Sequence, residues 1–174
     1  MLLGQGKYQE AQRRAEQTLG YEKEDWYSLL DIALDNLSLG RAYLQRAQKG
    51  QSGDYAQSET HLDQAVTGLR RSGRQDYVPR GLLARAALRR VTGDTDRARA
   101  DLEEAASIAE WGGMRLHQAD CHLEYTRLHL AEGKVDQARA SLATAKAMVE
   151  EMGYGRRDGE VEALENALEG VLNH

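Results

Sequence analysis

The stretch GDTDRARADLEEAASIAEWGG, from Gly93 to Gly113, sets the pattern that decides the fold. Counted from Gly93, small residues stand five and twelve positions on (Ala98 and Ala105), with Leu102 between them. The spacings of four and three residues between these positions match the period of an α-helix. The stretch therefore predicts one amphipathic helix of about four turns that ends at a glycine turn.

The same pattern occurs 40 residues upstream and 40 residues downstream. The matching positions are Gly53, Ser58, Leu62, Ala65 and Gly73 upstream, and Gly133, Ala138, Leu142, Ala145 and Gly153 downstream. A weaker copy starts at Gly6, with Ala11 and Ala15 in the matching positions. A period of this size is typical of helical-repeat proteins, in which stacked neighbours bury faces that one unit cannot bury alone.

Each repeat is predicted to contain two helices. Asp54 and Asp94 are suited to cap one of them, because a short carboxylate accepts hydrogen bonds from free N–H groups. The next helix along the chain is expected to begin near Asp76, Leu116 or Asp158. No segment alternates with period two, so we expect an all-α fold without strands.

The repeats predict a single domain over residues 1–174. We divide it into an incomplete first repeat over 1–24, repeats over about 25–73, 74–113 and 114–153, and a capping helix over 158–172. The capping helix is predicted from its apolar stripe, Val161, Leu164, Leu168 and Leu172. The first repeat lacks its opening helix, so we expect either a longer protein or a partner that covers an open face at Ala11 and Ala15.

Composition agrees with thin helix interfaces rather than one thick core. The chain is 41% hydrophobic and contains no Phe, one Pro and one Cys. One Cys excludes a disulfide within the chain, and no apolar run approaches the length that spans a bilayer. No signal peptide is evident at the N-terminus. We therefore expect a cytoplasmic protein that is not inserted in a membrane.

Two short motifs carry a family resemblance. Gly6-Lys7-Tyr8-Gln9-Glu10-Ala11 and Leu39-Gly40-Arg41-Ala42-Tyr43 resemble the second-helix and first-helix signatures of tetratricopeptide repeats. Later repeats depart from the first-helix signature, with Arg85, Ala86 and Arg89 in one and Tyr125, Thr126 and His129 in the next. The resemblance implies a right-handed solenoid of antiparallel helix pairs that acts as a non-catalytic protein–protein interaction scaffold.

The stretch from His117 to Glu162 resembles the C-terminal repeat arrays of large bacterial signalling ATPases and regulators. In those proteins the repeats serve as a sensor or docking arm beside a nucleotide-binding module. This chain contains no Gly-x-x-x-x-Gly-Lys-Ser/Thr loop, so we do not expect it to hydrolyse ATP.

The resemblance also implies a concave groove lined by the first helix of each repeat. The expected groove residues are Arg41, Gln45, Tyr77, Arg80, His117, Asp120, Glu124 and Arg127. The positions of the basic clamp found in chaperone-binding relatives hold Leu83, Ala87, Leu123 and Arg127. Capture of a chaperone C-terminus is therefore not expected. Another peptide could bind there, and a solvated face without a ligand stays open as the alternative.

The segment from Arg70 to Arg99 is strongly basic, with nine Arg, no Lys and three Asp, in a chain of net charge −5. A nucleic-acid surface would need aromatic side chains for stacking, and this segment offers only Tyr77. We do not expect nucleic-acid binding. The arginines are expected either to pair with acidic neighbouring repeats or to bind an acidic protein segment.

A cluster of potential metal ligands occurs at His117, Asp120, Cys121, His122 and Glu124. On one helix these residues fall on different faces, so they do not converge as a metal site requires. No base shares the face of Cys121, which argues against a nucleophile. We expect no catalytic residue, no metal and no cofactor, with an enzyme or metal site around His117 and Cys121 as a remaining alternative.

Three further expectations concern packing and partners. Leu116, Leu123 and Leu130 are predicted to fill the buried face of their helix. Trp26 and Trp111 are predicted to fill gaps between repeats, or else to anchor an interface. The partner is expected to be a protein or peptide of unidentified sequence. The alternative is a homodimer formed through the open N-terminal face.

Overall fold

All regular structure in the described part of the chain is helical. The structure is a computed structural model that describes residues 10, 12–16, 28–50 and 55–172. Its helices are α2 (Leu29–Gln48), α3 (Tyr55–Arg71), α4 (Val78–Val91), α5 (Thr95–Trp111), α6 (Arg115–Ala131), α7 (Val135–Met152), the 3-10 turn η1 (Gly155–Arg157) and α8 (Asp158–Leu172). Residues 10 and 12–16 are helical as well. The all-α prediction is confirmed for these residues, which contain no strand.

The starts of three helices repeat the 40-residue period of the sequence. Helices α3, α5 and α7 begin at Tyr55, Thr95 and Val135. The helices predicted near Asp76, Leu116 and Asp158 begin at Val78, Arg115 and Asp158. Asp94 caps α5 as predicted, because its side chain accepts a hydrogen bond of 3.3 Å from the backbone N of Arg97. Gly6, Trp26, Gly53 and Asp54 lie outside the described residues.

Glycines in the left-handed conformation end the helices. Gly73, Gly113 and Gly153 follow α3, α5 and α7 with φ angles of 72°, 62° and 62°. Gly93 and Gly133 follow α4 and α6 with φ angles of 85° and 72°. A side chain with a Cβ costs roughly 1–2 kcal/mol in this region, which explains why glycine recurs there.

The recurring small and apolar positions of the sequence are the buried positions of the fold. All nine of them keep at most 4% of their surface exposed: Ser58, Ala98 and Ala138; Leu62, Leu102 and Leu142; Ala65, Ala105 and Ala145. Their burial lets each helix lie close to its neighbours on two sides. The predicted stripe of α8 is also buried at Val161, Leu164 and Leu168.

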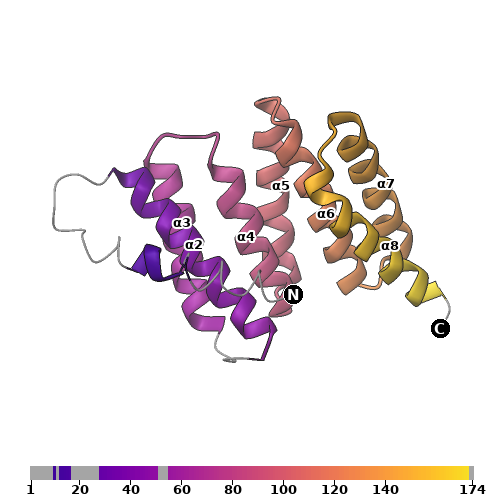
Figure 1. Cartoon of the computed structure of the whole chain (residues 1–174), viewed down its shortest axis with the longest axis horizontal. Coiled ribbons are helices and arrows are strands. Elements are labelled where there is room, and N and C mark those ends of the chain that lie inside the picture. The colour runs from indigo at the N-terminus through magenta and orange to yellow at the C-terminus, as the bar shows by residue number, and fades with distance from the viewer. Residues whose placement is uncertain (1–9, 11, 17–27, 51–54, 173–174) are drawn as a thin grey trace.

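The helices pack as neighbours along a row, which Figure 1 shows from α2 to α8. Each helix contacts the next one in the chain. In addition α2 contacts α4, α4 contacts α6, and α6 contacts α8, whereas α3 and α5 make no comparable contact within the described residues, nor do α5 and α7. The helices α2, α4, α6 and α8 therefore form the more closely packed layer.

Helices α2 and α3 approach each other closely at Gly40. A Cβ built on Gly40 would stand 2.6 Å from Cγ and Cδ2 of Leu62 and 3.1 Å from the Leu62 backbone N. The Ser58 hydroxyl donates a hydrogen bond of 2.8 Å to the Gly40 carbonyl oxygen. Glycine at this position thus removes the side chain that would separate the two backbones.

Three packing predictions are wrong. Trp111 was expected to fill a gap between repeats, but 91% of its surface is exposed, because it is the last residue of α5. Leu116 was expected to be buried, but it is 48% exposed at the start of α6. Ala15 was expected on an open face, but its exposed fraction is 3%. Ala11 lies outside the described residues.

Candidate functional site

A groove crosses the closely packed layer of helices. It has a volume of about 350 Å³ and is lined by α2, α4, α6, η1 and α8. Its lining residues are Arg41, Leu44, Gln45, Gln48, Leu83, Ala84, Ala87, Asp120, Leu123, Glu124, Arg127, Arg157 and Glu160. Because four helices contribute, the groove depends on the order of the helices in the row and not on any single loop.

The floor of the groove is apolar and the walls are polar. Helix α4 contributes Leu83, Ala84 and Ala87 to the lining, and the small side chains of the two alanines leave the groove its depth. Leu44 and Leu123, both buried, add apolar surface from the helices on either side. The groove therefore offers apolar area that can supply affinity, beside many polar and charged groups that can fix the orientation of a ligand.

The wall formed by α6 and α8 carries a chain of ion pairs. Glu124 accepts from Nε of Arg90 at 2.7 Å and from Nη1 of Arg127 at 3.0 Å. Arg127 also pairs with Glu160, and Glu160 pairs with Arg157. Together with Asp120, which pairs with Arg157, three carboxylates therefore alternate with three arginines along this series of ion pairs.

The chain of ion pairs ends at Asp120, whose Oδ1 accepts from Nε of Arg157 at 2.8 Å. Because cations and anions are equal in number, the wall is neutral as a whole. It also joins three helices, since Arg90 lies on α4, Asp120 on α6 and Glu160 on α8. A ligand that pairs with these groups has to displace a contact that already exists.

The pairing shifts the pKa values of Arg127 and Glu160 toward their charged forms. Burial by itself would lower the pKa of Arg127, but Glu124 and Glu160 outweigh burial and raise it. Burial by itself would raise the pKa of Glu160, but Arg127 and Arg157 outweigh it and lower the pKa. Arg127 and Glu160 are thus held in their ionised forms by the charges around them.

Five of the eight predicted groove residues line the groove: Arg41, Gln45, Asp120, Glu124 and Arg127. The four clamp positions, Leu83, Ala87, Leu123 and Arg127, line it as well. The structure thus brings together residues from the first helices of three repeats, as the prediction required.

The other three predicted residues lie at the edge of the groove. Nη2 of Arg41 donates to the carbonyl oxygen of Arg80 at 3.2 Å, and the guanidinium of Arg80 lies over the Tyr77 ring at 5.5 Å. Burial and the charges of Arg80, Arg41 and Arg157 lower the pKa of His117, against the opposing charge of Asp120. These three side chains are near the groove without lining it.

Arg157 and Glu160 were missed by the prediction. They stand 40 residues after His117 and Asp120, so the repeat period itself assigns them to the same two positions of the next repeat. The prediction treated the segment from 158 to 172 as a cap, and this assignment hid its contribution to the groove.

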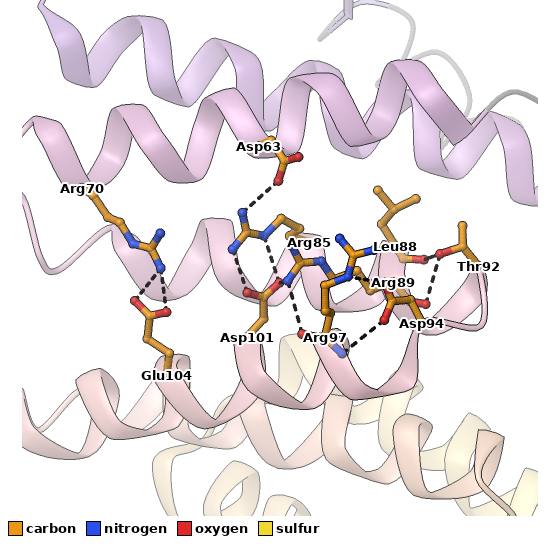
Figure 2. Close-up of polar contacts among 10 residues, drawn as sticks. All are labelled: Asp63, Arg70, Arg85, Leu88, Arg89, Thr92, Asp94, Arg97, Asp101 and Glu104. Atoms are coloured by element: carbon orange, nitrogen blue, oxygen red, sulfur yellow. Dashed lines mark hydrogen bonds and ion pairs between the residues drawn. The ribbon is translucent and has the colours of Figure 1, made fainter.

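The basic segment is largely paired within the chain, as Figure 2 shows for its central part. Asp101, buried on α5, accepts two hydrogen bonds from Arg85 at 2.8 and 2.9 Å and one from Arg89 at 2.7 Å. Arg85 also pairs with Asp63 of α3, and Arg70 pairs with Glu104 across α3 and α5. The prediction that the arginines pair with acidic neighbours is confirmed for these residues.

The cluster around Cys121 does not converge on a common site. Cys121 is 2% exposed, and burial raises the pKa of its thiol to about 12. A thiol with this pKa is almost entirely protonated at neutral pH and is a poor nucleophile. Among the residues that the structure describes, no group of three or more His, Cys, Asp and Glu side chains is placed to hold a metal ion.

A search for membrane spans gave no candidate. Within the described residues, no helix combines the length and the apolar character that crossing a bilayer requires.

Acid is expected to destabilise the protein before its carboxylates titrate. Burial lowers the pKa of His61, His117, His122 and His129 below the ordinary value of 6.5. The unfolded chain therefore binds more protons than the folded chain near pH 6, and stability falls as pH falls through this range. The urea midpoint should decrease from about pH 7.5 to about pH 5.5.

The variant His122→Gln tests the source of this pH dependence. Its urea midpoint should vary less steeply with pH than that of the wild type, whatever its absolute stability. A midpoint that stays constant over this range in the wild type would contradict the prediction.

Comparison with known proteins assigns no family to the chain. No family model matches it, and neither a curated protein nor a solved structure was found to be similar to it.

Proposed function

We propose that the chain is a right-handed helical-repeat solenoid of the tetratricopeptide type and acts as a non-catalytic scaffold that binds a peptide or a segment of a partner protein. The observation that carries the proposal is the groove lined by α2, α4, α6 and α8. The recurrence of helix starts and of buried small residues every 40 positions supports the repeat architecture.

The ligand is proposed to bind mainly to the apolar floor of the groove. The charged wall of α6 and α8 is neutral and internally paired, so it supplies shape and orientation more than attraction. Gln45 and Gln48 on the α2 wall can donate to and accept from the backbone of a bound segment. Recognition by apolar side chains and backbone amides is typical of peptide-binding grooves.

The cellular setting that we propose is a cytoplasmic signalling or regulatory assembly. Its support is the resemblance of the stretch from His117 to Glu162 to repeat arrays of bacterial signalling proteins. The alternative proposal, self-association through the N-terminal face, concerns a segment of which the structure describes only residues 10 and 12–16, and Ala15 is buried there.

A substitution on the groove floor tests the function. Peptides are first selected from a random display library on the wild-type chain, and their affinities are then measured by fluorescence anisotropy. Ala87→Arg places a long cation on the floor, in the column that holds Arg127 40 residues later, so the helix tolerates this side chain. We expect Ala87→Arg to weaken binding about tenfold or more. This corresponds to a loss of more than about 1 kcal/mol of binding free energy, as is typical of a residue that contributes to an interface.

The matched control is Ala140→Arg, which adds the same charge to an exposed position on α7 away from the groove lining. Its affinities should equal those of the wild type. Equal binding by both variants, with helical circular dichroism unchanged, would contradict a peptide site in the groove.

A further inference from the structure

The turn between α5 and α6 carries exposed apolar side chains that folding does not require. Among the described residues, the exposed large apolar side chains are Leu29, Trp111, Leu116 and Val171. Two of the four, Trp111 and Leu116, flank the same turn, and Trp111 is the most exposed of all at 91%. An exposed Trp is costly in solution and is enriched at the centres of interfaces.

The flanking repeats provide an internal control for this turn. The position of Trp111 is held by Arg71 in the repeat before and by Glu151 in the repeat after, both exposed. The position of Leu116 is held by Asp76 and Arg156, again both exposed. The matching positions of the 40-residue period thus carry charged residues in both flanking copies, although the local backbone differs, since Asp76 precedes α4 and Arg156 lies in η1. The apolar pair is therefore particular to the turn between α5 and α6.

A third apolar side chain lies at the same turn. Met114 covers the backbone of Gly112, because a Cβ built on Gly112 would stand 2.6 Å from Met114 Cε. Gly112 and Gly113 keep exposed surface beside the Met114 side chain, so another surface can contact the glycines and Met114 together. The turn thus projects from the molecule and fits against a second surface rather than enclosing a ligand.

Charges of both signs surround the apolar residues. Arg115 on α6 and Glu151 on α7 form an ion pair and keep 48% and 68% of their side chains exposed. Glu110 next to Trp111 is exposed as well. A patch with an apolar centre and both charges at its border is complementary to itself under a two-fold rotation, because the cation of one copy meets the anion of the other.

We propose that this turn is the contact between two copies of the chain, in which Trp111 and Leu116 pack against the same residues of the second copy. Arg115 of each copy then faces Glu151 or Glu110 of the other. The contact is small, so the dimer is weak and forms at high protein concentration. It lies on a different part of the fold from the groove, and it does not depend on the proposed peptide binding.

The experiment is sedimentation equilibrium of the full chain up to about 1 mM, where contacts of this size are populated. The wild type should show a monomer–dimer equilibrium. Trp111→Glu and Leu116→Arg copy residues that the following repeat already carries at these positions, so both variants should fold. We expect Trp111→Glu to raise the dimer Kd about 30-fold or more, the loss of a central Trp contact.

The control exchanges the charges of the border. Arg115→Glu combined with Glu151→Arg keeps the ion pair and its symmetry, so the dimer should persist, whereas Arg115→Glu alone should weaken it. A wild type that stays monomeric at the highest concentration would overturn the proposal. So would a dimer that Trp111→Glu leaves unchanged, because the contact would then lie elsewhere.

Discussion

Asp101→Asn is expected to lower the free energy of unfolding by about 3 kcal/mol, because it removes a buried carboxylate that Arg85 and Arg89 share. The side chain of Asp101 is 4% exposed, and those of Arg85 and Arg89 are 13% and 18% exposed. An asparagine keeps the shape but removes the counter-charge of Arg89 and leaves Arg85 with Asp63 alone, which is 51% exposed. The melting temperature should fall by roughly 10 °C.

The pair formed by Arg70 and Glu104 provides the matched control for Asp101→Asn. It also joins two helices in Figure 2, here α3 and α5, but both of its side chains are more than 40% exposed. Glu104→Gln should therefore cost less than about 1 kcal/mol, as exposed ion pairs do. Urea denaturation measures both variants. A similar loss for the two would show that burial does not govern the strength of these pairs.

The second large effect is expected from Gly40→Ala. The added methyl group would lie 2.6 Å from buried Leu62, and the Leu62 backbone at 3.1 Å leaves little room for retreat. Overpacking of this kind costs about 1–3 kcal/mol, which exceeds the gain of up to about 1 kcal/mol from replacing glycine in a helix. We expect a net loss of about 1 kcal/mol in the free energy of unfolding.

Gly159→Ala and the double variant Gly40→Ala/Leu62→Ala separate steric overlap from helix propensity. No atom lies within 4 Å of a Cβ built on Gly159 in α8, so this variant should be as stable as the wild type or slightly more stable. In the double variant the shortened Leu62 side chain admits the methyl group. The loss in the free energy of unfolding of the double variant should therefore be smaller than the sum of the losses of the two single variants. Strict additivity would contradict a steric clash between these two residues.

The sequence was sufficient to predict the helices and most of their buried contacts. Ala98, Leu102 and Ala105 and their counterparts were recognised because burial of small residues between helices recurs at a fixed period. A periodic pattern carries this information because every repeat faces the same neighbours. The glycine turns followed for the same reason, since each needs a positive φ angle at the same place.

The centre of each helix pair was not predictable, because its chemistry changes from repeat to repeat. Arg85, Arg89 and Asp101 form an ion cluster in one repeat. The matching region of the next repeat holds the stacked rings of Tyr125 and His129, with centroids 6.0 Å apart. The sequence shows that these residues depart from the signature. It does not show which side chains they contact, because some of these side chains lie on other helices and are brought near only by the packing of the helices.

The candidate groove was predictable for the helices that were assigned to repeats. Its residues after position 153 were missed, because the 40-residue period was assumed to end there. Asp120, Glu124 and Arg127 do line the groove, but the pairing of Arg127 with Glu160 and of Asp120 with Arg157 depends on side-chain reach between helices. The exposure of Trp111 could not be predicted from the 40-residue period. The period places Trp111 at a helix end, but the burial of a side chain there depends on how the neighbouring turns are oriented.

The recurrence of left-handed glycines has a consequence for how this chain tolerates changes in length. Gly93 and Gly133 have similar backbone conformations, and each is followed after one residue by a helix that starts in the same register. Deleting or duplicating 40 residues between these glycines rejoins equivalent turns and keeps every buried column aligned. An insertion of one or two residues inside a helix rotates its buried face by about 100° per residue instead. Length variation among descendants of such a chain should therefore occur in whole repeats or within turns.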